Sequence, residues 1–120
     1  MKGQAFIKRA TYALAGWQSA FATERSFRTQ IVAAVAAIGV TALISPSLIW
    51  WAFILLSIAL VLAAELFNTA LERCLDGLHP NQAEFVRQAK DCAAGAVLIF
   101  SCASVIIFVL MVLDSGRFAT

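Results

Sequence analysis

The sequence predicts an all-α integral membrane protein, with three transmembrane helices preceded by an N-terminal amphipathic surface helix. Two observations lead to this fold class. Of the 120 residues, 62% are hydrophobic and only 13% are charged, with a mean hydropathy of +0.86, whereas soluble domains are typically about 45–50% apolar and about 25% charged. The apolar residues also fall into three stretches of roughly the 20 residues that a membrane span needs. We therefore expect residues 1–120 to form a single membrane domain.

The surface helix is expected at about residues 5–24. Apolar side chains recur there at steps of three or four residues, as on one side of an α-helix. They are Phe6, Ala10, Leu14, Trp17 and Phe21. Basic and polar residues lie mostly off this stripe, which is typical of a helix that lies among the lipid headgroups. A fourth helix packed on the bundle would show the same pattern, so both interpretations stay open.

The three transmembrane spans are expected at about 27–44, 48–76 and 88–113. The first ends at the sequence SPS, because Pro46 cannot continue a helix and a serine before it favours a turn. The second begins at Leu48 and continues as a helix from its apolar part through a run of polar residues. The third contains the longest apolar run, at 93–113.

The basic residues predict the orientation of the chain in the bilayer. Eight of the nine lysines and arginines precede the first span or lie between the second and the third, and only Arg117 follows the last span. The positive-inside rule then places the N-terminus in the cytoplasm and the C-terminus outside, with Trp50 and Trp51 at the outer interface. The net charge of +2, without a run of lysines or arginines, gives no reason to expect nucleic-acid binding.

Polar residues interrupt the apolar character of the second span. At steps of three, four and four residues, they project from one face of an α-helix. They are Glu65, Asn68, Glu72 and Asp76. Ionisable groups at membrane depth are costly and usually functional. For Asn68, a structural hydrogen bond to a neighbouring helix explains the residue as well as a functional role does. For Glu65 and Glu72 together a structural contact explains less, because such a contact needs no repeated negative charge.

Two further polar clusters are expected at the same depth. The sequence QAKD places Lys90 and Asp91 in the first turn of the third span, where free backbone N–H groups favour a phosphate. The sequence TERSFR places Glu24 between the surface helix and the first span. The alternatives are snorkelling of Lys90 to the interface and a weak ion pair of Glu24 with Arg25 or Arg28.

Together these residues are suited to phosphoryl transfer onto a hydroxyl at the membrane surface. Glu24 and Glu72 provide hard oxygen ligands of the kind that Mg²⁺ uses together with substrate phosphates. Lys90 would neutralise the transferring phosphoryl group, and Glu65, deepest in the apolar layer, would act as the general base. The sequence has neither a Walker A loop nor a glycine-rich nucleotide loop, so the residues alone do not identify the phosphate donor.

Three segments resemble the small prokaryotic diacylglycerol kinase family: ELFNTALE (65–72), AKDCAAGAVL (89–98) and TERSFR (23–28). The resemblance covers most of the chain, and its most specific part is the pattern E-x-x-N-x-A-x-E followed 18 residues later by K-D. It implies a homotrimer of three-span subunits in the bacterial inner membrane. The implied reaction transfers the γ-phosphate of MgATP to a lipid alcohol.

The resemblance also implies roles for individual residues. Glu65 corresponds to the catalytic base, and Glu24 and Glu72 correspond to ligands of the metal and the nucleotide. Tyr12 aligns with a tyrosine that contacts the nucleotide. The family's other polar active-site positions, which the resemblance assigns to binding of the nucleotide, are matched by Asn68, Asp76, Lys90 and Asp91.

The chain departs from the family pattern at several positions. Gln30 stands where the family has a second acidic residue, and Ala5 stands where an arginine is usual. The family's loop histidine falls at Ala83, while His79 lies four residues earlier. Nucleotide contacts of the loop 77–87 are therefore left open.

The lipid acceptor is also left open by the sequence. The segments NTA (68–70) and KDCAAGA (90–96) look more like the undecaprenol kinase branch than like the diacylglycerol-specific members, which tend to read N-S-A and K-D-M-G-S-A. The product would be undecaprenyl phosphate in the first case and phosphatidic acid in the second.

Two other classes of function are consistent with parts of the pattern. A small ion- or proton-coupled transporter would also contain buried acidic groups, although all the acidic clusters gather on the predicted cytoplasmic side. A non-catalytic membrane assembly subunit would use the small-residue face AAVAAIG (33–39) for close helix packing. That face suits a trimeric enzyme equally well.

Overall fold

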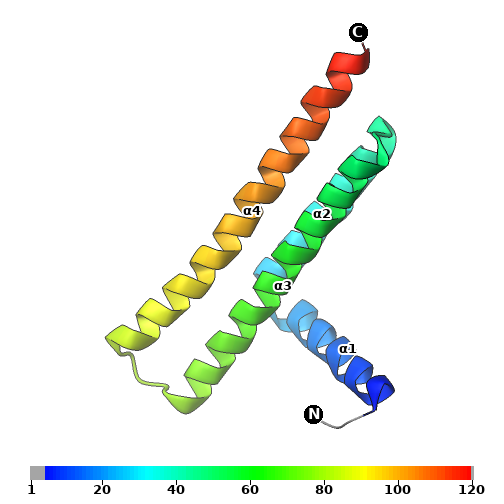
Figure 1. The fold of residues 1–120 in the computed structure, drawn as a ribbon. Helices are drawn as coiled ribbons and strands as arrows, with labels where there is room; N and C mark the ends of the chain where they lie inside the picture. The colour runs from blue at the N-terminus through cyan, green and yellow to red at the C-terminus, as the bar shows by residue number, and fades with distance from the viewer. Residues whose placement is uncertain (1–4, 120) are drawn as a thin grey trace.

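The computed structural model describes residues 5–119, and the side chains of residues 5–116, as a set of α-helices (Figure 1). These are α1 (Phe6–Thr23), α2 (Arg25–Ile44), α3 (Leu48–Leu78) and α4 (Glu84–Ala119). The described residues contain no strand, so the all-α prediction is confirmed. Helices α2, α3 and α4 are long and apolar enough to cross a membrane, which confirms the prediction of three transmembrane helices.

The turn between α2 and α3 lies at the predicted SPS sequence. Ser45 follows α2 in the left-handed conformation (φ 55°, ψ 57°), and its N–H donates to the Thr41 carbonyl oxygen at 2.8 Å. Pro46 comes next, and Ser47 is the N-cap residue of α3. A left-handed residue followed by a proline is a common way to end a helix, so the chain reverses within three residues.

Helices α3 and α4 form a long antiparallel pair that extends beyond the start of α2 (Figure 1). α3 contains 31 residues and α4 contains 36, whereas α2 contains 20. At about 1.5 Å per residue, only α2 is matched to a hydrocarbon core about 30 Å thick. The ends of α3 and α4 that meet at residues 79–83 therefore extend past the first transmembrane helix, and they contain most of the predicted site.

One buried face runs along α3. Its residues recur at steps of three or four, as expected for one side of a helix. They are Ile54, Ser57, Val61, Ala64, Glu65 and Thr69. Near the 45–47 turn this face packs on α4, where the Ser57 and Ser104 hydroxyl oxygens lie 3.2 Å apart. Toward the 79–83 loop the same face becomes polar, so the packing face continues directly into the predicted acidic stripe.

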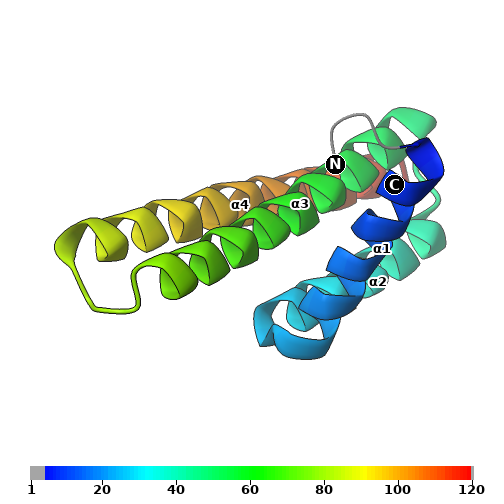
Figure 2. The same cartoon turned by 90° about the horizontal axis from the view of Figure 1, so that it is seen from below.

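Helix α1 diverges from the other three helices at the start of α2 (Figures 1 and 2). A single extended residue, Glu24 (φ −109°, ψ 110°), separates α1 from α2. Ala20 is the one buried residue of α1, while Trp17 and Phe21 of the predicted apolar stripe are 52% and 50% exposed. The stripe is therefore available to lipid. The placement of α1 in the plane of a membrane surface stays a prediction.

Candidate functional site

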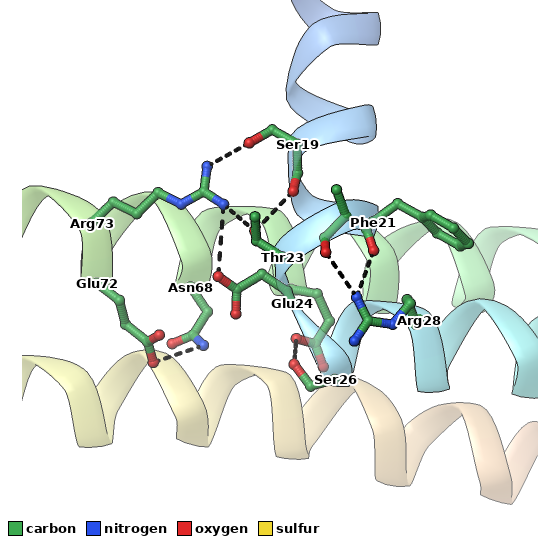
Figure 3. Close-up of polar contacts among 11 residues, drawn as sticks. Ser19, Phe21, Thr23, Glu24, Ser26, Arg28, Asn68, Glu72 and Arg73 are labelled. Carbon is green, nitrogen blue, oxygen red and sulfur yellow. Dashed lines mark hydrogen bonds and ion pairs between the residues drawn. The ribbon is translucent and has the colours of Figure 1, made fainter.

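Three of the predicted site residues lie near the break between α1 and α2: Glu24, Asn68 and Glu72 (Figure 3). Glu65 is the most enclosed of all the predicted site residues, with 3% of its surface exposed. Both of its carboxylate oxygens accept hydrogen bonds from α2: Oε2 from the Ser26 hydroxyl at 3.0 Å, and Oε1 from the Gln30 amide at 3.4 Å. The same Gln30 nitrogen donates to the Ser101 hydroxyl of α4 at 3.4 Å. These hydrogen bonds offset part of the free-energy cost of burying the carboxylate.

Asn68 and Glu72 follow Glu65 along the same face of α3. Asn68 Nδ2 donates to Glu72 Oε1 at 3.3 Å. Asn68 Oδ1 is buried and has no hydrogen-bond partner among the described residues. A buried acceptor without a partner costs roughly 1–3 kcal/mol. This oxygen is therefore available to a donor or a cation that approaches beside Glu72.

Glu24 is linked to α3 through Arg73. Its Oε1 lies 3.7 Å from Arg73 Nη2. Arg28 instead donates from Nη1 to the carbonyl oxygens of Phe21 and Ala22, at 2.8 and 3.2 Å. Carbonyls in the last turn of a helix have no partner within that helix, so Arg28 caps α1. The alternative pairing of Glu24 with an arginine of its own segment is therefore wrong.

The two predicted metal ligands come from different parts of the chain. In Figure 3 the Glu24 carboxylate points toward α3, where Glu72 and Arg73 occupy successive positions. Within residues 5–119, no group of three or more His, Cys, Asp or Glu side chains could hold a metal ion by itself. A site of two carboxylates and an amide oxygen, completed by substrate phosphates, is the arrangement that Mg²⁺ typically accepts. The oxygen donors of that type in this region are Glu72 and Asn68, which bond to each other on α3, and Glu24, which faces the adjacent Arg73.

Asp76 and Lys90 form an ion pair across the loop that joins α3 to α4. Lys90 Nζ donates to Asp76 Oδ1 at 2.7 Å, and the two side chains are 35% and 65% exposed, respectively. The structure thus brings together two predicted site residues that are 14 positions apart in the sequence. Asp91 has a different partner, because its Oδ2 accepts a hydrogen bond from Arg87 Nη1 at 2.9 Å.

The expectation that Lys90 and Asp91 lie in the first turn of the third span is wrong. Helix α4 begins at Glu84, so both residues lie in its second turn. The early start has a local cause, because Glu84 accepts hydrogen bonds from Arg87 and Gln88, and such i,i+3 and i,i+4 pairs stabilise a helix. Free backbone N–H groups are confined to the first turn. Lys90 can therefore serve a phosphate through its ammonium group, without an adjacent helix N-terminus.

Tyr12 lies on α1, two turns before Ser19, and is 45% exposed. The structure adds three residues that sequence reasoning did not assign to the site: Ser26 and Ser101, which lie next to Glu65 and Gln30, and Arg73. Gln30 was noticeable only as a departure from the family pattern. No sequence signal pointed to Arg73, since it lies off the polar stripe of α3 and its partners come from α1.

The family model for prokaryotic diacylglycerol kinase matches residues 11–112. The chain is 43% identical over 97 residues to a diacylglycerol kinase of Synechocystis, an alignment that covers 80% of this chain and 55% of that protein. It is 38% identical over 109 residues to an undecaprenol kinase of Bacillus subtilis, with coverages of 90% and 88%. It is 30% identical over 105 residues to a diacylglycerol kinase of Escherichia coli, with coverages of 88% and 86%. The chain thus spans about half the length of the Synechocystis relative and most of the other two.

Proposed function

Because this chain belongs to the prokaryotic diacylglycerol kinase family, a family of lipid kinases, we propose that it transfers the γ-phosphate of MgATP to the hydroxyl of a membrane lipid alcohol. The observation that carries this proposal is Glu65, a buried carboxylate with hydrogen-bond donors on both oxygens. Further carboxylates and an ion-paired lysine lie beyond it toward the 79–83 loop. Family membership favours this function over a transporter and over a non-catalytic subunit.

Glu65 acts as the general base. The hydroxyl proton of the lipid passes to its carboxylate while the lipid oxygen forms a bond to the γ-phosphorus. The bond between that phosphorus and the β–γ bridging oxygen breaks, and ADP leaves. Ser26 and Gln30 hold the two carboxylate oxygens in one orientation. The apolar residues around Glu65 limit access of water, which would otherwise compete with the lipid as acceptor.

The oxygen atoms around Asn68 fit a magnesium ion. Asn68 Oδ1 is a buried acceptor that has no partner within the described part of the chain, and Nδ2 of the same side chain donates to the Glu72 carboxylate. We assign Glu72 and Glu24 as the protein carboxylates of the ion. When bound, Mg²⁺ supplies positive charge against the phosphates. Lys90, positioned by Asp76, adds a second positive charge on the side of α4.

An apolar groove along α2, α3 and α4 suits the hydrocarbon part of the acceptor. Its volume is about 430 Å³, and Gln30 and Ser101 line it together with apolar residues such as Val105 and Phe108. Since Gln30 also donates to Glu65, a lipid chain in this groove would have its hydroxyl close to the base. The lipid hydroxyl would then reach the nucleotide while the hydrocarbon part of the lipid stayed in the membrane.

The remaining assignments extend the proposal from the family resemblance. We assign Tyr12 and Asp91 to the nucleotide, in addition to the residues above. The subunits form a homotrimer in the bacterial inner membrane, with the N-terminus in the cytoplasm and the C-terminus outside. The structure is consistent with this orientation, because Arg28, Arg73 and Lys90 all lie toward the end of the bundle where the site lies.

The proposal is tested with the purified protein in lipid vesicles, Mg²⁺ and ATP labelled at the γ-phosphate. Diacylglycerol and undecaprenol are supplied in separate reactions, because relatives named for each acceptor match the chain. Label in the lipid extract of either reaction supports a lipid kinase, and the ratio of the two rates identifies the acceptor. Vesicles without added acceptor are the control. Absence of labelled lipid in both reactions would overturn the proposal.

A further inference from the structure

Arg73 links α3 to α1 and to the break between α1 and α2. Its Nη1 donates to the Ser19 hydroxyl at 3.0 Å, and its Nη2 donates to the Thr23 hydroxyl at 2.5 Å and lies 3.7 Å from Glu24 Oε1 (Figure 3). An arginine is suited to this task because its planar guanidinium offers five N–H donors in a fixed geometry. One side chain of a transmembrane helix therefore holds three residues of the N-terminal segment.

The side of α1 that meets Arg73 lies opposite its apolar stripe. At 3.6 residues per turn, Ser19 and Thr23 fall about half a turn away from the stripe that contains Trp17 and Phe21. Tyr12, two turns before Ser19, falls on the Arg73 side. When Arg73 is bonded to α1, the apolar stripe is turned away from Arg73, and Tyr12 is turned toward the same side as the site. Arg73 thus sets the rotation of α1 about its own axis.

Glu24 has an unusual setting for an N-cap residue. It precedes α2, but its side chain makes no capping hydrogen bond, although a carboxylate at this position commonly accepts one from the first turn. The carboxylate points to Arg73 instead. The two side chains are 30% and 47% exposed, so the ion pair contributes little to stability. Its effect is to orient the Glu24 carboxylate toward α3.

We propose that Arg73 is a positioning residue, which holds α1 and Glu24 in the arrangement that lets Glu24 and Glu72 serve one nucleotide. The effect of this role on catalysis rests on the proposed kinase function. The contacts of Arg73 with Ser19, Thr23 and Glu24, which we call the tether, do not depend on that function. Lysine at this position keeps the charge but has a single nitrogen, which cannot bond both hydroxyls and the carboxylate in this geometry. Arg73→Lys should therefore raise the KM for MgATP by about 10-fold and leave kcat within about 2-fold, as expected when a residue that supports a ligand is lost.

The tether is tested by hydrogen exchange of residues 19–28 in the protein without nucleotide, in vesicles of the same lipid for every variant. Arg73→Lys should speed this exchange by about 10-fold, because freed helix ends open more often. The double variant Ser19→Ala/Thr23→Val removes the two acceptors from the opposite helix and should have the same effect. Arg25→Lys is the matched control, since it makes the same chemical change one residue beyond Glu24 and outside the Arg73 contacts.

The outcomes separate the tether from the kinase. Wild-type exchange in both the Arg73 variant and the double variant would overturn the tether. Faster exchange with an unchanged KM for MgATP would overturn the positioning role. If the unaltered protein phosphorylated no lipid, the proposed function and the catalytic consequence would both fail, while hydrogen exchange would still decide whether Arg73 holds α1.

Discussion

The two ends of the α3–α4 pair differ in how their polar groups are satisfied. At the end near the 45–47 turn, which we call the turn end, Trp50 Nε1 donates to Asp114 Oδ2 at 2.8 Å, and Ile54 and Met111 are buried. At the end near the 79–83 loop, the loop end, the half-buried Asn68 has a buried side-chain oxygen without a partner among the described residues. At the turn end, Trp50 and Asp114 satisfy each other across α3 and α4. At the loop end, Lys90 and Asp76 also pair across the two helices, but the Asn68 oxygen needs a further partner.

This difference separates stability from chemistry along one pair of helices. The α3 face that packs through Ile54 and Val61 continues as Glu65 and Thr69, so burial is common to both ends and only the kind of group changes. Polar substitutions at the turn end should affect the free energy of unfolding. Polar substitutions at the loop end should affect turnover, because the groups there are arranged for a substrate.

The largest expected effect is that of Glu65→Gln. The amide has nearly the same size but cannot take the proton of the lipid hydroxyl, so kcat should fall by about 10²–10⁴-fold, with little change in the melting temperature. The measurement is transfer of label from ATP to lipid, together with thermal unfolding in the same detergent.

Asp114→Asn is the matched control for that change, since it converts an acid to an amide at the turn end. It should leave kcat within about 2-fold, because Asn keeps an oxygen that can accept the Trp50 hydrogen bond. Turnover of Glu65→Gln within a few-fold of the unaltered protein would remove the general-base role from Glu65.

The next effect concerns the ion. Glu72→Gln removes the carboxylate that bonds to Asn68, whose Oδ1 has no partner among the residues that the structure describes. It should raise the Mg²⁺ concentration for half-maximal rate by about 10–100-fold. Titration of Mg²⁺ at constant ATP measures this shift, and high Mg²⁺ should restore part of the rate. Glu84→Gln, which changes a carboxylate bonded to Arg87 at the start of α4, is the control. An unchanged Mg²⁺ requirement would exclude Glu72 as a ligand.

A smaller effect is expected at the rim of the loop end. Lys90→Met keeps the length of the side chain but removes the charge that pairs with Asp76, so the KM for ATP should rise by about 5–10-fold through loss of one charge-assisted hydrogen bond. Asp76→Asn leaves the ammonium in place and should raise the KM less. Initial rates at varied ATP measure both. Equal effects of the two changes would indicate that the ion pair, and not the lysine charge, is what the nucleotide requires.

The fold could be predicted from sequence because its signals are local. The signals are the length of each apolar span, the steps of three or four residues between polar side chains, and the proline at position 46, which ends a helix. The helices and the turn that these signals predict agree with the structure. The start of α4 was missed by several residues because it depends on side-chain pairs around Glu84. The contacts of Glu24 and Glu65 could not be predicted, since Arg73 and Gln30 reach them only once α1, α2 and α3 are placed in space.

The smallest effect is expected for Trp50→Phe, and it tests the turn end directly. Phenylalanine keeps an aromatic ring near Phe53, whose ring centroid lies 6.3 Å from that of Trp50, but it has no N–H to donate to Asp114. Loss of this one hydrogen bond should lower the free energy of unfolding by about 1 kcal/mol and leave kcat and the KM for ATP unchanged. Thermal or denaturant unfolding in detergent measures the free energy of unfolding, and the label-transfer assay measures kcat and the KM for ATP.

Trp51→Phe, the same change at the adjacent residue, is the control and should lower stability less. If Trp50→Phe reduced turnover as well, the two ends of the α3–α4 pair would be mechanically coupled, and the separation of stability from chemistry along these helices would be wrong.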